Sequence, residues 1–330
     1  MSATEASSSR VLKQRVLLLG ATGTIGRATA QALLSRGHDV VALVRPGRAR
    51  DLPAGVIGRE GPVCEAGSVA RDGLCGERFD ALVSCLASRT GAPADAWAVD
   101  HVAHQQALQA AQQAGVSRFV LLSAICVQRP RLAFQQAKLA FEAELQASGL
   151  DWTIVRPTAF FKSLSGQVER LRRGRPFLLF GDGTLTACKP ISDADLGGFV
   201  ADCLTDPARS RCILPIGGPG PALTPREQGG LLFAALGLEP HFRSVPVGLL
   251  DAIAAGLSLA GRVWPPLAAK ADLARIGRYY ATESMLVWDA AAQRYDAAAT
   301  PSTGRDTLAA HYARLASGEL RADLGAHAVF

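Results

Sequence analysis

The chain of 330 residues is poor in lysine, in tyrosine and in long apolar runs. Only five of its 35 basic residues are lysine, and its net charge of +6 contains no run of five consecutive cations. A charge so small and so dispersed argues against a dedicated nucleic-acid-binding protein and fits anionic small molecules better. Seven cysteines, an odd number without a CxxC pair, argue against a disulfide framework or a zinc knuckle and favour a reducing cytoplasm.

No segment has the pattern of a convincing transmembrane span. Residues 1–14 contain no apolar core, so we expect a disordered tail rather than a signal peptide or an anchor. Residues 247–264 are more apolar, but Asp251 and Arg262 interrupt them, and a span needs about 20 apolar residues. We expect this segment to form a pocket wall or to contact a membrane surface.

Apolar runs alternate with helical spacing through the first half of the chain. Buried-strand patterns lie at 15–20, 39–45, 79–88, 118–125 and 151–158, and helical patterns lie at 24–36, 100–115 and 134–149. This alternation predicts an α/β fold, a Rossmann-type doubly wound parallel sheet with helices on both faces. After residue 158 the regular alternation of strand and helix patterns ends, and one late strand is expected to return to the sheet near 213–217.

A glycine-rich turn, GATGTIG, lies between the first strand and the first helix. In this context Gly20 permits the tight turn, Gly23 lets the backbone approach a pyrophosphate, and Gly26 lets the helix pack closely on the strand. The helix N-terminus offers free N–H groups to the phosphates. The predicted dinucleotide-binding residues here are Gly20, Ala21, Thr22, Gly23, Thr24, Ile25 and Gly26.

The end of the second strand selects between the two nicotinamide cofactors. An NAD-preferring site usually has a carboxylate there for the ribose hydroxyls, whereas this strand runs into Arg45 and Arg48. A guanidinium fork suits the 2′-phosphate, so NADPH is the expected cofactor. We therefore expect an NADP-binding core over 15–158 and a smaller, mainly substrate-binding region over 159–330.

The glycine spacing, a strand ending at Ser123 and a helix carrying Lys138 together resemble the NmrA-like group of atypical short-chain dehydrogenases. Ordinary members have a tyrosine four positions before the lysine, and here that position is Phe134. Because a lysine-activated phenol is what takes a proton from an alcohol, its absence argues against simple alcohol–ketone chemistry. Lys138 and Ser123 remain the predicted catalytic residues, and Lys138 is also expected to hold the cofactor ribose.

Longer strings resemble a narrower family, the NADPH-dependent divinyl chlorophyllide 8-vinyl reductases of chlorophyll and bacteriochlorophyll biosynthesis. The resemblance covers about residues 15–330, and phenylalanine at position 134 agrees with it. The strings that carry it are PRLAFQQAKLAFEAEL, VRPTAFFKSLSGQVERLRRGRPFLLFGDG, CKPISDADLGGFV, ESMLVWD and RYDAAATPSTGRDTL.

This resemblance implies reduction of the C8 vinyl group of a magnesium tetrapyrrole to ethyl. NADPH would deliver hydride to the vinyl terminus, the macrocycle would delocalise the charge, and a proton would arrive from Lys138, a late tyrosine or water. Pro157 and Thr158 of the RPT turn would lie beside the cofactor. The predicted substrate residues are Phe160 and Phe161, as walls of an apolar slot, and Lys162 and Lys189, as partners of the substrate propionate.

His101 and His104 lie three positions apart on a predicted helix, but a solvated helix face explains them, so no metal ligand is assigned. The protein is expected in the cytoplasm, with peripheral contact to the photosynthetic membrane where its apolar product is used. Two alternatives stay open. One is a noncatalytic NADP-sensing regulator, which could lack the tyrosine; the other is a different NADPH-dependent double-bond reductase.

Overall fold

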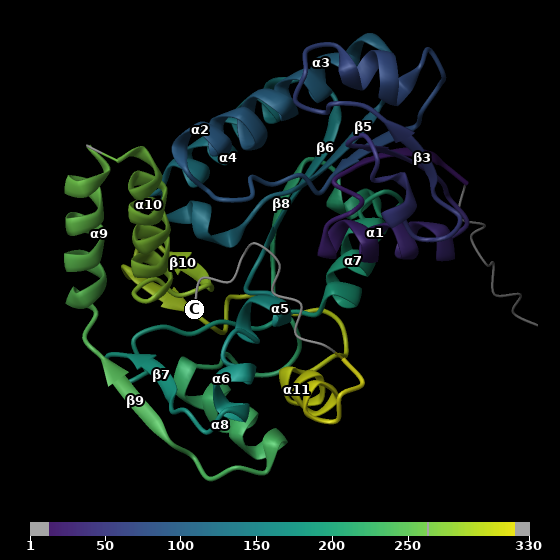
Figure 1. Ribbon diagram of the computed structural model, residues 1–330. Coiled ribbons are helices and arrows are strands. Elements are labelled where there is room, and N and C mark those ends of the chain that lie inside the picture. The colour runs from purple at the N-terminus through teal and green to yellow at the C-terminus, as the bar shows by residue number, and fades with distance from the viewer. Residues whose placement is uncertain (1–12, 263, 321–330) are drawn as a thin grey trace, which may run out of the picture.

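The computed structural model describes residues 13–262 and 264–320, and its centre is a seven-stranded parallel sheet (Figure 1). This confirms the predicted Rossmann-type α/β fold, because the first six strands have the doubly wound order 3-2-1-4-5-6. From one edge to the other, the strands are β3 (Ile57–Glu60), β2 (Asp39–Val44), β1 (Arg15–Leu19), β4 (Ala81–Ser84), β5 (Arg118–Leu122), β6 (Asp151–Pro157) and β8 (Cys212–Ile216).

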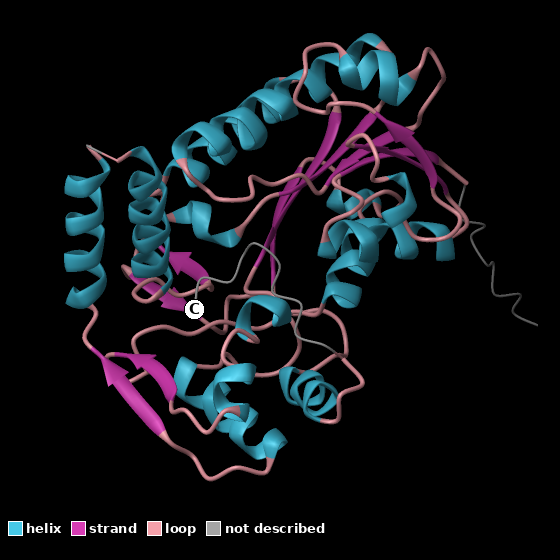
Figure 2. Cartoon of the chain, in the orientation of Figure 1, coloured by secondary structure: helices cyan, strands magenta, loops and turns pink. Residues whose placement is uncertain are grey.

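Both faces of the sheet are covered by helices, as Figure 2 shows. The side chains of β1 alternate between two apolar clusters: Val16 and Leu18 belong to one, Leu17 and Leu19 to the other. This alternation explains why the strand is apolar at each position from Val16 to Leu19 instead of every second one. The covering helices are α1 (Thr24–Ser35) and α7 (Asp193–Asp202) on the first face, and α3 (His104–Gln113) and α4 (Ala133–Ala147) on the second.

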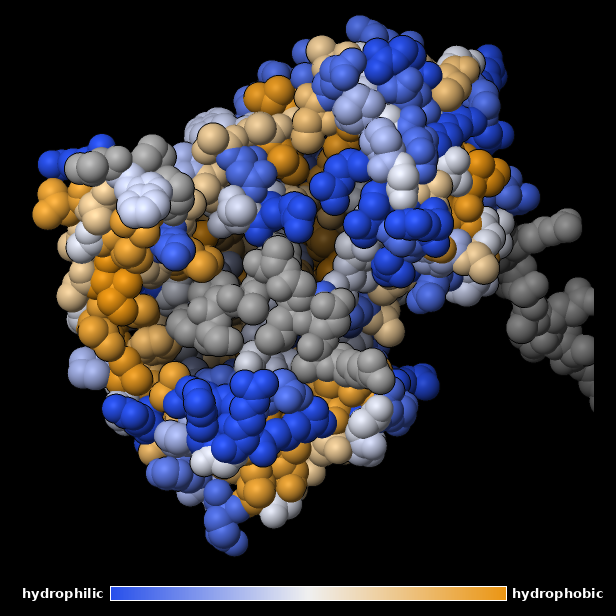
Figure 3. Space-filling view, in the orientation of Figure 1, coloured by the Kyte–Doolittle hydropathy of each residue, from blue (hydrophilic) through white to orange (hydrophobic). Residues whose placement is uncertain are grey.

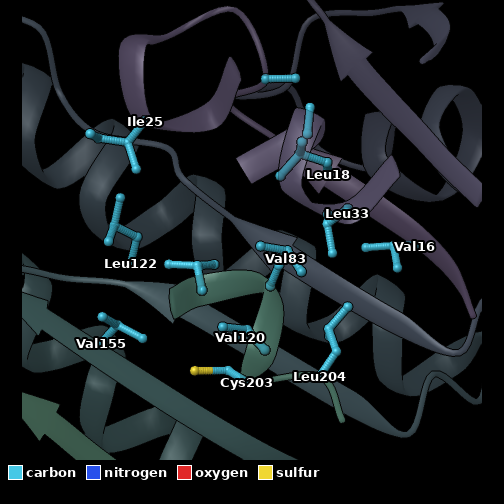
Figure 4. Packing of buried hydrophobic residues seen from close by; sticks show 14 of the residues in the cluster. Val16, Leu18, Ile25, Leu33, Val83, Val120, Leu122, Val155, Cys203 and Leu204 are labelled. Atoms are coloured by element: carbon cyan, nitrogen blue, oxygen red, sulfur yellow. The ribbon is translucent and has the colours of Figure 1, made fainter. Parts of the chain in front are cut away.

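The core on the α1 and α7 side joins residues from both halves of the chain. Figure 4 shows Val16 and Leu33 near Leu204, which follows α7 in sequence. Gly197 allows α7 to approach α1, since a Cβ at that position would lie 2.5 Å from the carbonyl carbon of Ala28. The region beyond residue 158 therefore contributes α7 as well as β8 to the sheet body.

Some elements differ from the expected ones. The segment expected as one helix over 100–115 is the end of a longer helical run formed by α2 (Pro93–Ala96), η3 (Trp97–Ala103) and α3. The edge strand β3 was not predicted, because its four residues are mostly exposed and carry no apolar pattern. The remaining short helical turns are η1 (Ala49–Asp51), η2 (Val69–Leu74), η4 (Ile125–Gln128) and η5 (Pro207–Arg209).

The C-terminal elements form a second layer of structure beside the carboxyl ends of the strands (Figure 1). One apolar cluster packs around Tyr312 and Phe161, and another joins Phe134 to Ile276 and Tyr279. The elements are α5 (Phe161–Leu164), α6 (Val168–Arg172), β7 (Phe177–Phe180), α8 (Pro225–Leu236), β9 (Phe242–Val245), α9 (Gly248–Gly261), α10 (Pro265–Tyr280), β10 (Val287–Asp289), β11 (Arg294–Asp296) and α11 (Leu308–Ala316).

The apolar segment near 247–264 forms α9, which packs on α10. Across residues 13–262 and 264–320, none of the helices has the length and apolarity that a membrane crossing requires. Most of the tail expected to be disordered, residues 1–12 of 1–14, lies outside the described residues.

Candidate cofactor and substrate site

The predicted site residues gather at the carboxyl edge of the sheet. The glycine turn follows β1, Ser123 follows β5, and Thr158 follows β6. The strand order reverses between β1 and β4, and dinucleotides bind in the crevice at such a switch point. Figure 3 shows the surface hollowed between this edge and the C-terminal elements.

The backbone of the glycine turn is packed too closely for a side chain at two of its positions. Gly20 has φ of +78°, and a Cβ there would lie 2.6 Å from the carbonyl carbon of Cys85. A Cβ at Gly26 would lie 2.1 Å from the carbonyl oxygen of Gly20. Any side chain at either position would therefore displace backbone, which explains why both are glycine.

The N-terminus of α1 is suited to an anion. Its N-cap Gly23 has no side chain to accept from the first N–H groups, and no acid occupies the first turn. Ala21 and Ile25 bury their side chains in the core, so only their backbone could face a cofactor. Thr24 accepts a hydrogen bond from the Lys162 ammonium at 3.2 Å. This places Lys162, predicted for the substrate, beside the glycine turn.

Two arginines follow β2 as the sequence indicates, but their surroundings differ. Arg48 forms an ion pair with Asp51, whereas Arg45 is exposed and has no ion pair within the described residues. The carboxylate of Glu60 accepts from the Ala49 N–H at 3.2 Å, and such backbone hydrogen bonds lower the pKa of Glu60. Arg45 is therefore the better placed of the two arginines to receive an additional anion.

Lys138 is held by a partner that sequence reasoning missed. Its ammonium lies 2.9 Å from Oδ1 of Asp100, and both side chains are buried. Oδ2 of Asp100 has no hydrogen-bond partner among the described residues. A buried lysine and carboxylate fix each other's position, because separating them would leave a charge in a low dielectric.

A neutral histidine lies next to this pair. Burial, followed by the positive charge of Lys138, lowers the pKa of His104 to about 4. Its ring contacts the Ser84 hydroxyl at 2.8 Å and the Val99 carbonyl at 2.9 Å. His104 is buried, so the expected solvated helix face was wrong for this residue. Both ring nitrogens are occupied by protein groups, so His104 supports η3 and β4 instead of reaching into the crevice.

Ser123 is connected to a second buried carboxylate. Its hydroxyl donates to Glu142, which also forms an ion pair with Arg156. Glu142 lies one helical turn after Lys138 on α4, so both charged groups extend from one face of the helix. With its proton directed to Glu142, Ser123 can serve a ligand as an acceptor.

Position 134, four residues before Lys138, has a phenylalanine in place of the usual tyrosine. Its ring is buried in the same cluster as Tyr279. The Tyr279 hydroxyl donates to the carbonyls of Cys126 and Arg129, and burial raises its pKa. Tyr295 donates to Glu283, and burial raises its pKa too. These late tyrosines hold their protons tightly and direct them to protein groups.

The turn after β6 is tied to Lys189. Thr158 lies beyond Pro157 at the end of β6, and its hydroxyl donates to the Lys189 carbonyl. The Lys189 ammonium donates to the Thr300 carbonyl at 2.7 Å and contacts the Ser302 hydroxyl at 3.2 Å. Lys189 therefore fastens the C-terminal segment to this turn, with one N–H left for any ligand.

A cavity of about 390 Å³ opens beside Thr24. Phe161 and Lys162 line it, together with His311 and Arg314 from α11. Phe160 is partly buried and packs against the first core cluster instead of this cavity. The two predicted aromatic residues thus have different surroundings, and of the two Phe161 lines this cavity.

Comparison with known proteins identifies the family. Residues 20–207 match the model of an NAD(P)H-binding family. The chain is 47% identical to a divinyl chlorophyllide a 8-vinyl-reductase, chloroplastic, of Oryza sativa subsp. indica, covering 96% of this chain and 82% of that protein. It is 44% identical to the protein of the same name from Cucumis sativus, covering 96% and 79%.

The chain belongs to the divinyl chlorophyllide a 8-vinyl-reductase family.

Solved structures agree with the fold of this family. The chain matches a Thermus thermophilus UDP-glucose 4-epimerase in complex with NAD with a TM-score of 0.61 and 23% identity, covering 70% of this chain and 86% of that one. It matches AtPrR2 with NADP+ and (+)pinoresinol with a TM-score of 0.60 and 19% identity, covering 74% and 83%. The cofactor class of this family member is accordingly a nicotinamide dinucleotide.

The acidic groups of the site, Asp100 and Glu142, are the functional candidates that sequence reasoning missed. A spacing signal existed for Glu142, four residues after Lys138, but none existed for Asp100, which is 38 residues away. Within the described residues, no group of three His, Cys, Asp or Glu side chains could hold a metal ion.

Proposed function

We propose that this protein reduces the 8-vinyl group of divinyl chlorophyllide or divinyl protochlorophyllide to an ethyl group with NADPH. The observation that carries the proposal is the identity of 44–47% with relatives of that name over nearly the whole chain. Phenylalanine at position 134, four residues before Lys138, supports it, because reduction of a carbon–carbon double bond needs no proton removed from an alcohol.

The residues of the glycine turn and Arg45 would hold the cofactor. The turn leaves backbone N–H groups of α1 open to a pyrophosphate, and Arg45 would bind the 2′-phosphate that distinguishes NADPH from NADH. When bound, the nicotinamide supplies the hydride. Pro157 and Thr158 would border the nicotinamide half of the site, at the end of the strand next to β5.

Lys138 would hold the ribose and retain a proton for the substrate carbon that becomes negative. Asp100 fixes the ammonium in place, and burial excludes competing water. Ser123, fixed by Glu142, would accept a hydrogen bond near the reacting groups. We place the macrocycle against the C-terminal elements, with Lys162, Lys189 and the Phe160–Phe161 pair as its proposed contacts. The protein would work at the surface of the photosynthetic membrane, where such pigments are used.

A direct product assay tests the proposal. Purified protein is incubated with NADPH and divinyl chlorophyllide, and the pigment is analysed by chromatography and by its Soret band. A monovinyl product is expected, and Lys138→Ala should lower turnover at least tenfold, the usual size of a general-acid contribution. An intact protein that leaves the divinyl pigment unchanged would refute the assignment. It would also favour a noncatalytic NADP-binding role.

A further inference from the structure

The surface helix α9 has its apolar side facing outward. Its strongly exposed side chains include Leu249, Ile253 and Leu259, and Trp264 follows the helix at 66% exposure. The residues between them on this face are alanine and glycine. Figure 3 shows the apolar side chains gathered over α9. A helix of a soluble protein normally places such residues toward the core and its polar residues toward water.

Contacts with α10 fix this orientation. Ser258 receives a hydrogen bond from Arg275 at 2.6 Å, and Asp251 receives one from Arg278 at 3.0 Å. Leu250 is buried. The two hydrogen bonds to α10 and the burial of Leu250 therefore fix the inner side of α9. Rotation of the helix to bury its exposed apolar side chains would break both hydrogen bonds and expose Leu250.

The charges around this face favour an anionic partner. The two acids of the helix pair, Asp251 and Asp272, are both matched by arginines of α10. Arg262 and Lys270 are exposed, and neither forms an ion pair within the described part of the chain. The unmatched charge beside the apolar face is therefore positive, as on helices that bind anionic lipid surfaces.

We infer that α9 docks the protein on a bilayer that contains anionic lipid, with the helix lying in the interface. Fourteen residues make a helix about 21 Å long, which is too short to cross a bilayer and suited to lie along one. Its outer face, about 10 Å wide, offers on the order of 200 Å², well below the roughly 800 Å² per partner of a stable protein interface. Trp264 at its end has the amphipathic ring that favours the headgroup level.

Vesicle flotation of the full-length protein, without pigment or cofactor, tests this inference. Vesicles of phosphatidylcholine containing about one third phosphatidylglycerol should bind the protein at least tenfold more tightly than phosphatidylcholine alone. A triple variant with Leu249→Ser, Ile253→Ser and Leu259→Ser should bind at least tenfold more weakly. The control is a pair of exposed leucines outside α9, Leu185→Ser and Leu238→Ser, which should bind within twofold of the wild type.

Three further measurements distinguish a lipid partner from a second copy of the chain. Arg262→Glu with Lys270→Glu should abolish the preference for anionic vesicles, and the Trp264 emission should shift to the blue on binding and lose that shift in Trp264→Phe. Binding by the triple variant equal to wild type would overturn the inference. The inference would also be overturned if the wild type is a dimer in sedimentation analysis, the triple variant is a monomer, and neither binds vesicles. The apolar face of α9 would then contact a second copy of the chain.

The docking inference rests on the surface of α9 and goes beyond the proposed reaction by naming the surface and its lipid partner. Pigment reduction is measured separately, with dispersed substrate and no vesicles. If the wild type reduces the pigment but does not bind vesicles, only the docking inference is refuted. If it binds vesicles but does not reduce the pigment, only the proposed reaction is refuted.

Discussion

Replacing Asp100 with asparagine should destabilise the protein and disable the site, because it removes one charge from a buried pair. The substitution keeps the shape of the side chain but leaves the Lys138 ammonium, 2.9 Å away, without its counter-ion. Breaking a buried ion pair on one side costs about 3–5 kcal/mol. For 330 residues the unfolding entropy is about 0.7 kcal/mol/K, so the melting temperature should fall by about 4–7 °C.

A double-mutant cycle separates the pair from its surroundings. Lys138→Met alone should be about as destabilising as Asp100→Asn, since it leaves the carboxylate buried without its cation. The double variant should lose less than the sum of the two, with a coupling free energy of about 1.5–3 kcal/mol. The assays are thermal unfolding, for the melting temperatures, and urea unfolding, for the free energies, of the four proteins, both followed by circular dichroism. A melting temperature for Asp100→Asn within 1 °C of wild type, together with additive single effects, would show that the two charges do not depend on each other.

The cofactor turn and the buried histidine give three further predictions. Arg45→Glu should lower the ratio of kcat/KM for NADPH to kcat/KM for NADH by about 10- to 100-fold, the size of one charge-assisted hydrogen bond. The control Arg50→Glu should change this ratio little. An unchanged ratio in Arg45→Glu would show that Arg45 does not bind the 2′-phosphate. Gly26→Ala should weaken dinucleotide binding at least tenfold in calorimetry, because its Cβ would meet the Gly20 carbonyl at 2.1 Å, whereas Gly230→Ala, with open space around it, should bind normally. His104 has a folded-state pKa of about 4, below its ordinary 6.5, so the unfolded chain binds more protons between these two pH values. The free energy of unfolding should therefore fall by about 3 kcal/mol as the pH drops from 6.5 toward 4. In denaturant titrations, His104→Asn should show a weaker dependence on pH.

The parallel sheet was predictable because its signals are local. Each central strand is a short apolar run buried on both faces, and the glycine turn needs only its own backbone geometry. β3 was not predicted, because an exposed edge strand carries no such apolar run. The pairing of β7 with β9 was not predicted either. It joins two four-residue strands about 65 positions apart, and neither segment alone indicates its partner.

The candidate site was predictable in part for the same reason. Lys138 stands out by the scarcity of lysine and by its place on a helix after β5. Its partner Asp100 becomes its neighbour only when η3 packs against α4. Lys162 likewise meets Thr24 at the start of α1, 138 positions earlier in the chain, only through folding. Which charges meet depends on packing between distant segments, and no spacing rule gives that.

Isotope transfer follows the proposed hydride from NADPH to the vinyl group. A single turnover with NADPH deuterated at the transferable position of the nicotinamide, followed by mass spectrometry and NMR of the pigment, locates the label. Hydride delivery to the vinyl terminus should give a monovinyl product with one deuterium in the terminal methyl of the new 8-ethyl group. A product without deuterium, or a deuterium on the carbon attached to the ring, would contradict the proposed transfer.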